Sequence, residues 1–319
     1  MWGNGRAPGT VRRMHGGLRV TFEFTVREDQ IDHLGHMNVR FYAVAACEGT
    51  DALLAELPGW GGRPHVVHDL YTRHLREQLL GTPLVVRSGL IAASADGLTL
   101  HHELAAADTG VLAATFVYRV AAVGEGGRVP LPAPLVERLA AEVVPAPDYA
   151  VSRTISLAAD GPSNAPTLAA AAERGLALRR PRPVTADECD AAGRYRVDMA
   201  PLLTWGGEPL NGDRGGALDE GADGTLMGWA SMETRLQAVR LPRVGDRVQS
   251  FGACVAVHDK VTHRIHWVYD VDRGDLLTGF EVVSLAFDVR SRRPMPIPDA
   301  TRARELATLQ PDLAPRTPA

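Results

Sequence analysis

Hydrophobic and polar residues follow one another along the first half of the chain in an order typical of an α+β domain. The alternating segment LRVTFEFTV, which begins at Leu18, predicts a strand. The Ala/Leu-rich segment 41–57 is long enough for a helix and is stopped by Pro58 and Gly59. Further strand-like segments follow at 66–75, 83–94, 98–107 and 111–123. Asp-Gly and Asp-x-Gly turns between them favour antiparallel hairpins, and we expect the helix to cover the sheet as a second layer.

The second half repeats this order. The segments VREDQIDHLGHMNV (26–39) and VTADECDAAGRYRV (184–197) align without a gap at an offset of 158 residues (190 − 32), with five identities. The offset grows to 164 (245 − 81) at a glycine of a later turn, as small loop insertions in two copies of one fold would produce. The second helix, in VDMAPLLTW, is interrupted by Pro201 and runs into the glycine-rich stretch 206–224, so we expect it to be shorter or broken.

We therefore predict an α+β chain with two tandem domains. The expected boundaries are a disordered tail at 1–17, a first domain at 18–145, a linker at 146–174, a second domain at 175–305 and a tail at 306–319. The linker is rich in Ala, Pro and Ser, and its segment TLAAAAERG predicts a short helix.

Composition narrows the classes of partner. The 319 residues are 45% hydrophobic and 23% charged with a formal net charge of −4, which argues against disorder and against nucleic acid as a partner. Cys47, Cys189 and Cys254 show no C-x-x-C spacing, so we expect no metal site and no redox pair. No apolar run approaches the roughly 20 residues of a membrane span, and we predict a cytoplasmic protein without a membrane partner.

The loop between the first strand and the first helix carries a recognisable motif. Its string IDHLGHMNVRFY contains, in order, Asp32, Gly35, His36, Met37, Asn38 and Tyr42. This string resembles the D-x-x-G-H-[LM]-N fingerprint of hotdog-fold acyl-CoA thioesterases of the 4-hydroxybenzoyl-CoA thioesterase-like group. The resemblance implies a hotdog fold in each half, that is, a long helix wrapped by an antiparallel sheet. A tandem pair is similar to the double-hotdog arrangement, so we expect the halves to form an intramolecular pseudo-dimer with a continuous sheet.

The chemistry of thioester hydrolysis gives the loop residues their expected roles. The reaction needs a group that activates water or attacks the carbonyl, and positive potential where the oxyanion develops. A carboxylate shortly before a helix supplies the first, and unpaired N–H groups of the opening turn supply the second. Gly35 allows a sharp turn after Asp32. The resemblance implies that Asp32 is a nucleophile or a general base, whereas a cap or loop aspartate is the alternative interpretation.

The remaining residues of this loop have weaker assignments. His36 is a proton carrier or a loop histidine that fixes its neighbours. Asn38 orients water or caps the helix, and Tyr42 contacts substrate or packs. Gly35 is predicted to approach the substrate.

Two further carboxylates are secondary catalytic candidates. Asp69 falls where resembling thioesterases carry a glutamate, in a pattern that reads D-L-Y-T-R-H-L-R-E in this chain. At the offset of 164 its counterpart is Glu233 (233 − 69). Because hotdog sites form between two copies, the resemblance lets Asp32 work beside either of them. The alternative interpretation is that Asp69 and Glu233 are solvated carboxylates at strand ends without a catalytic role.

The second loop keeps Asp190 but has Arg194 and Arg196 where the first has His36 and Asn38. The arginines would pair with the aspartate and weaken it as a base, or would hold CoA phosphates as substrate-binding residues. The simpler interpretation is that one half keeps the catalytic loop and the other supports it.

The sequence therefore predicts a thioesterase that hydrolyses an acyl-CoA or acyl-carrier-protein substrate to the free acid without a metal or redox cofactor. A non-catalytic acyl-CoA-binding or scaffold protein is the first alternative. A hotdog hydratase or dehydratase is the second, but its G-D-x-N-P-[LIV]-H loop is absent, and the nearest string, GDRVQS at Gly245, lacks Asn-Pro and His. Whether double-hotdog chains form a homo-oligomer is left open.

Overall fold

The computed structural model describes residues 17–158, 162, 164–210, 218–221 and 224–315. The chain divides into two compact units, Met1–Val151 and Ser152–Ala319. The predicted N-terminal tail, apart from Gly17, and part of the glycine-rich stretch lie outside the described residues.

The first unit is one antiparallel sheet with one long helix. Its strands are β1 (Arg19–Thr25), β2 (His65–His74), β3 (Pro83–Ser94), β4 (Gly97–Ala106), β5 (Leu112–Gly124) and β6 (Gly127–Val129). Their spatial order is β1-β3-β4-β5-β2, with β6 paired to β5. The helical elements are η1 (Glu28–Gln30), α1 (Val39–Glu56), α2 (Ala133–Ala140) and η2 (Asp148–Ala150). The predicted order of strand, long helix and meander is confirmed.

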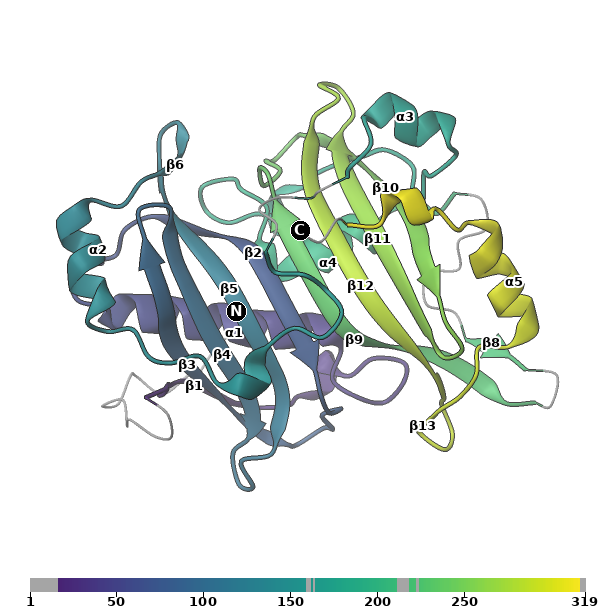
Figure 1. The fold of residues 1–319 in the computed structure, drawn as a ribbon, viewed down its shortest axis with the longest axis horizontal. Coiled ribbons are helices and arrows are strands. Elements are labelled where there is room, and N and C mark those ends of the chain that lie inside the picture. The colour runs from purple at the N-terminus through teal and green to yellow at the C-terminus, as the bar shows by residue number, and fades with distance from the viewer. Residues whose placement is uncertain (1–16, 159–161, 163, 211–217, 222–223, 316–319) are drawn as a thin grey trace. The chain divides into compact units, whose positions relative to one another are not determined.

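Helix α1 lies across one face of this sheet and contacts β1, β3 and β4 (Figure 1). It has 18 residues and is therefore about 27 Å long. Gly49 lets the helix come close to the strands, because a Cβ atom there would lie 2.7 Å from Val86 Cγ1 and 3.0 Å from Thr21 Oγ1. The closeness of this contact fixes the depth at which α1 packs.

We expect Gly49→Val to lower the free energy of unfolding by about 1–3 kcal/mol, because the added methyl groups must displace packed side chains. Ala55→Val is the matched control, because Ala55 is exposed on the same helix and the change should cost no more than about 0.7 kcal/mol of helix propensity. Urea denaturation of both variants measures the difference, and equal losses would contradict this packing.

A buried chain of hydrogen bonds fixes α1 to the sheet. Thr50 Oγ1 lies 3.1 Å from His102 Nε2, and His102 Nδ1 lies 2.7 Å from Ser88 Oγ. Ser88 Oγ lies 2.7 Å from Thr21 Oγ1, which continues the chain to β1. Burial, with a smaller contribution from the neighbouring His101, lowers the pKa of His102 to about 3. The imidazole is therefore neutral at pH 7 and can donate with one nitrogen and accept with the other.

The second unit has the same strand order with a shorter helix. Its strands are β7 (Arg182–Pro183), β8 (Asp219–Glu220), β9 (Leu226–Ala238), β10 (Arg247–Val257), β11 (Val261–Asp270), β12 (Leu276–Asp288) and β13 (Arg293–Pro294). Their spatial order is β7-β10-β11-β12-β9, with β8 paired to β9 and β13 to β12. The helical elements are α3 (Leu168–Glu173), η3 (Ala186–Glu188), η4 (Val197–Met199), α4 (Ala200–Trp205), α5 (Asp299–Ala307) and η5 (Pro311–Leu313).

The expected short second helix is confirmed as α4, which has six residues. Pro201 lies in its first turn, where the missing N–H costs no hydrogen bond, and so it does not interrupt the helix. The predicted short helix of the linker is also present, as α3.

The two faces of the second sheet have separate cores. One face packs on Leu203 of α4 through Val248 and Val268. The other face, with Phe251 and Trp267, is covered by residues from α3 and η5, namely Ala171 and Leu313. Residues as far as 313, which we predicted as part of a tail, are therefore packed because they cover an apolar sheet face.

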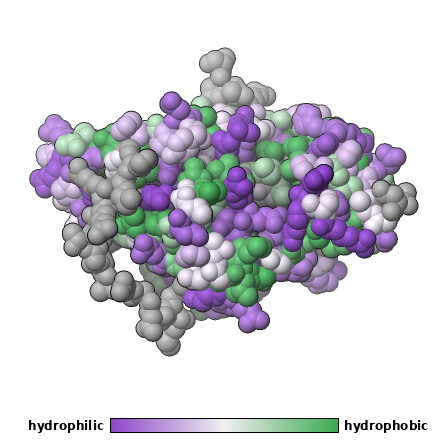
Figure 2. All heavy atoms as spheres, turned by 90° about the horizontal axis from the view of Figure 1, so that it is seen from below, coloured by the Kyte–Doolittle hydropathy of each residue, from purple (hydrophilic) through white to green (hydrophobic). Residues whose placement is uncertain are grey.

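Hydrophobic side chains also remain at the surface, and Figure 2 shows them interspersed with hydrophilic residues. Leu79 and Leu80 are 56% and 59% exposed in the turn before β3. None of the described helices is long and apolar enough to cross a membrane.

Candidate functional site

The loop of the first unit makes a tight turn around Asp32. Asp32 N–H donates to the His36 carbonyl at 2.9 Å, and Gly35 N–H donates to the Asp32 carbonyl at 3.0 Å. Gly35 has a φ of 82°, in the left-handed region that favours glycine. The expected sharp turn at Gly35 is therefore present, and it leaves the Asp32 side chain in front of α1.

Backbone hydrogen bonds hold this loop from both sides. Met37 N–H donates to the Gln78 carbonyl at 2.7 Å, and Asn38 N–H donates to the Gln30 carbonyl at 2.9 Å. The Met37 side chain is 1% exposed and anchors the loop in the core. Gln30 and Gln78 could not be predicted from the sequence, because the contacts that hold the loop are made by their main-chain carbonyls.

The two oxygens of the Asp32 carboxylate have different surroundings. Oδ1 accepts a hydrogen bond from Leu34 N–H at 2.9 Å, which fixes the orientation of the group. Oδ2 lies 3.5 Å from Nδ1 of His36, which is a long contact for a hydrogen bond. The same His36 nitrogen lies 3.4 Å from the Met37 carbonyl oxygen. The loop thus holds one carboxylate oxygen and leaves the other beside an imidazole.

Asn38 is the N-cap of α1. Its Oδ1 accepts from Arg40 N–H at 3.0 Å, and its backbone carbonyl accepts from Phe41 N–H at 2.9 Å. Among the residues described, no acceptor lies within hydrogen-bond distance of Val39 N–H. Of the two roles weighed for Asn38, the cap is therefore observed.

We expect Asn38→Ala to destabilise the first unit by about 1 kcal/mol, because Arg40 N–H loses its acceptor. Asn38→Asp keeps an acceptor at the N-cap and should retain the stability of the wild type. Thermal unfolding of the two variants checks the assignment, and an equal loss in both would show that the cap hydrogen bond is not what Asn38 contributes.

A shallow pocket opens at this loop. Its volume is about 220 Å³, and it is lined by Asp29, Gln30, Ile31, Asp32, Asn38, Arg40 and Phe41. The structure therefore brings Asp32 and Asn38 into one pocket. Phe41 also lines it. Arg40 was not identified from the sequence, although a basic residue in the first turn of a helix is an unusual signal.

Tyr42 and Asp69 lie outside this pocket. Tyr42 is buried, its hydroxyl donates to the Arg76 carbonyl at 2.9 Å, and its ring meets the His74 ring edge-on at 5.1 Å. Asp69 lies in β2, 3.7 Å from Arg119 Nη1, and is five residues before His74. Those five residues span about 16 Å of strand. Within the first unit, Tyr42 packs and Asp69 is not brought together with Asp32.

Glu233 binds the main chain at the beginning of the second unit. Its carboxylate accepts hydrogen bonds at 3.1–3.2 Å from the N–H groups of Arg153, Thr154 and Ile155. Glu233 is 4% exposed. A carboxylate held by three consecutive amides has an evident structural role, which the sequence pattern did not predict.

The second loop has the same backbone turn, but its arginines are paired with aspartates of the same loop. Asp190 N–H donates to the Arg194 carbonyl at 2.7 Å, and Gly193 has a φ of 71°. Both Nε and Nη2 of Arg194 lie 3.0 Å from Asp190 Oδ2. Arg196 forms a two-pronged ion pair with Asp198, at 3.2 and 2.6 Å. Either guanidinium would have to leave its carboxylate to bind a phosphate, which favours the supporting role.

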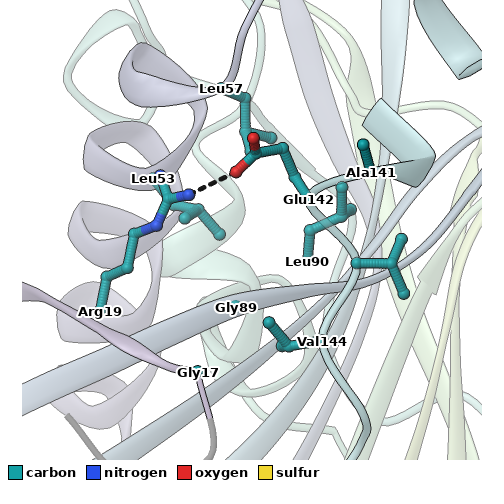
Figure 3. Close-up of a pocket in the computed structure, with 10 residues that line it drawn as sticks. Gly17, Arg19, Leu53, Leu57, Gly89, Leu90, Ala141, Glu142 and Val144 are labelled. Atoms are coloured by element: carbon teal, nitrogen blue, oxygen red, sulfur yellow. Dashed lines mark hydrogen bonds and ion pairs between the residues drawn. The ribbon is translucent and has the colours of Figure 1, made fainter. Parts of the chain in front are cut away.

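A second cavity of about 170 Å³ lies at the other end of α1 (Figure 3). It is lined by Leu53, Leu57 and Leu90 among others, and Arg19 at its edge pairs with Glu142 at 2.5 Å and with Glu56 at 3.6 Å. Both carboxylates are therefore engaged, and the cavity offers no nucleophile. The described residues also contain no group of three or more His, Cys, Asp or Glu side chains that could hold a metal ion.

Comparison with known proteins finds one family model and several solved structures that are similar to this chain. Residues 26–147 match the family model of the thioesterase-like superfamily. The chain resembles the 12:0-ACP thioesterase from Umbellularia californica, with 10% identity, 83% of this chain and 93% of that chain covered, and a TM-score of 0.57. It also resembles an acyl-ACP thioesterase from Bacteroides thetaiotaomicron, with 10% identity, coverage of 82% and 96%, and a TM-score of 0.55. At this identity the likeness confirms the predicted hotdog fold and shows the fold alone. No curated protein sequence matches the chain.

Proposed function

We propose that this chain hydrolyses an acyl-CoA or acyl-carrier-protein thioester to the free acid. The match of residues 26–147 to the family model of the thioesterase-like superfamily supports this proposal. The observation that carries the proposal is the arrangement of Asp32 in the pocket at the first turn of α1. One carboxylate oxygen is fixed by Leu34 N–H, and the same pocket is lined by Asn38, the N-cap of α1.

The proposed reaction uses the Asp32 carboxylate and the first turn of α1 together. As a general base, Asp32 takes a proton from water, and the resulting hydroxide adds to the thioester carbonyl. The oxyanion accepts a hydrogen bond from Val39 N–H in the positive field of the helix N-terminus. Collapse of this intermediate breaks the C–S bond, and the thiolate takes the proton that Asp32 holds. As a nucleophile, Asp32 would instead add to the carbonyl and form an acyl anhydride as the C–S bond breaks and the thiolate leaves. Water then hydrolyses the anhydride to the free acid and regenerates Asp32, and the proton released protonates the thiolate.

We also propose that the two units are copies of one hotdog fold, of which only the first retains a catalytic loop. The shared strand order and the matching turns at Gly35 and Gly193 support the copies. The ion pair between Asp190 and Arg194 supports the loss of chemistry in the second loop. The pairing of the units as an intramolecular pseudo-dimer stays a prediction from the family resemblance.

The test is release of free thiol from a panel of acyl-CoA and acyl-carrier-protein thioesters by the full chain. We expect multiple-turnover release from at least one of them. Binding of thioesters without turnover would contradict the proposal and would favour the alternative of a non-catalytic acyl-CoA-binding protein. Comparison of kcat/KM for CoA and for the acyl-carrier protein, each bearing the same acyl group, shows which of the two thioesters the chain prefers.

A further inference from the structure

Arg40 places a positive charge in the same pocket as Asp32. It lies in the first turn of α1, and its guanidinium carbon is 4.6 Å from the centroid of the Phe41 ring. This cation–π contact orients the half-buried side chain. Among the residues described, no carboxylate lies within ion-pair distance of Arg40.

Asp29, an acidic residue of the same pocket, is already paired with another arginine. Arg27 holds Asp29 through two hydrogen bonds of 3.0 Å. The pKa of Asp29 is lowered, chiefly by the hydrogen bond from Arg27 and only to a small extent by the charge of Arg40. The guanidinium of Arg40 therefore has no ion-pair partner among the described residues and can pair with another anion.

The position of Arg40 is electrostatically unfavourable within α1 itself. The N-terminus of a helix carries a partial positive charge, so that carboxylates stabilise the first turn and cations destabilise it. The first turn of α1 contains no acidic residue. A cation that is half-buried and repelled by its own helix would gain most from an anion that enters the pocket.

In the second loop, the residue that corresponds to Arg40 is part of an ion pair. At the offset of 158, Asp198 stands where the first loop has Arg40 (198 − 40), and Arg196 stands where it has Asn38. These two residues form the ion pair described above. In the loop whose aspartate is paired with an arginine, this position is thus also part of an ion pair, whereas Arg40 has no ion-pair partner among the residues that the structure describes.

We propose that Arg40 determines substrate specificity by binding a carboxylate on the acyl part of the thioester. A guanidinium matches a carboxylate in a two-pronged geometry. Arg40 and Asp32 line the same pocket of about 220 Å³, so an anion bound by Arg40 would lie close to the thioester attacked at Asp32, whereas the pantetheine arm places the phosphate of CoA many bonds from the thioester. An anion at Arg40 therefore belongs to the acyl side. The assignment rests on the proposed function, because it takes the thioester to be attacked at Asp32.

Glutaryl-CoA and pentanoyl-CoA test this assignment, because their acyl chains have the same length and only the first ends in a carboxylate. We expect Arg40→Gln to lower the ratio of their kcat/KM values, glutaryl over pentanoyl, by about 10- to 100-fold, as for loss of a hydrogen bond to a charged group. Arg40→Lys should retain part of the ratio because it keeps the charge. Arg63→Gln removes an exposed arginine outside the pocket and should leave the ratio unchanged.

The same acyl groups on N-acetylcysteamine, which carries no phosphate, separate the two sources of an anion. The proposal predicts that Arg40→Gln lowers the ratio for these short thioesters as well. If the variant slows both CoA thioesters equally and spares both N-acetylcysteamine thioesters, Arg40 binds a phosphate and the acyl assignment is overturned. An unchanged ratio with both thiols also overturns it.

Binding of non-hydrolysable thioether analogues of glutaryl-CoA and pentanoyl-CoA, measured by calorimetry, makes the test independent of turnover. We expect the wild type to bind the carboxylated analogue more tightly and Arg40→Gln to lose this preference. If that holds in a chain that hydrolyses nothing, the proposed function fails and the assignment of Arg40 stands. If hydrolysis occurs but neither preference depends on Arg40, the assignment fails alone.

Discussion

Asp32→Asn is expected to lower kcat/KM for thioester hydrolysis by about 10²- to 10⁴-fold, the range for loss of a catalytic proton acceptor. Asparagine has nearly the same shape, and its carbonyl oxygen can still accept from Leu34 N–H, as Asp32 Oδ1 does. It can neither take a proton from water nor attack a carbonyl. The loss should therefore fall on the chemistry, with the loop geometry preserved.

Initial rates of thiol release, measured on the best substrate of the panel, give this loss directly. Circular dichroism and thermal unfolding of the same preparation show whether Asp32→Asn is folded as the wild type is. A folded variant that retains wild-type kcat/KM would remove Asp32 from the mechanism, whereas an inactive but unfolded one would call for Asp32→Ser as a second variant.

The second large effect concerns stability in acid. The pKa of His102 is lowered by burial to about 3, whereas an unfolded chain has a histidine pKa near 6.5. Between these values the unfolded chain binds more protons, so stability rises with pH in this window and is lost as the pH falls. At pH 5 this one histidine should cost about 2 kcal/mol relative to pH 7 and above.

His102→Gln tests this contribution, because glutamine keeps a donor and an acceptor for Ser88 and Thr50 but does not titrate. We expect the variant to be less stable than the wild type at pH 7.5. Its further loss on going to pH 5 should be smaller by about 2 kcal/mol. Urea denaturation at the two pH values measures both quantities, and an equal loss in the two proteins would show that His102 does not couple folding to protons.

Local patterns were sufficient to predict most elements. The alternation in β1, the Ala/Leu-rich helix ended by Pro58, and the glycine turns have local causes, and the structure has each of them. The turn at Gly35 and the cap at Asn38 were also expected from short-range rules. These features depend on a few neighbouring residues, which is why one sequence predicts them.

Long-range contacts could not be predicted in the same way. The amides that bind Glu233 are about 80 residues before it in the chain, and nothing in its own strand indicates them. Packing of Leu313 depends on an apolar sheet face that the short tail segment does not reveal. Arg40 is different, because a basic residue in the first turn of α1 is visible in the sequence and breaks the usual charge preference.

The central claim is that one of the two loops carries the chemistry, and a matched pair of variants tests it most directly. Asp32→Asn and Asp190→Asn make the same change in the same backbone turn. On one thioester, with kcat/KM as the measured quantity, Asp32→Asn should lose about 10²- to 10⁴-fold and Asp190→Asn should lose far less. Equal losses in the two variants, or a larger loss in Asp190→Asn, would contradict the assignment of catalysis to the first loop.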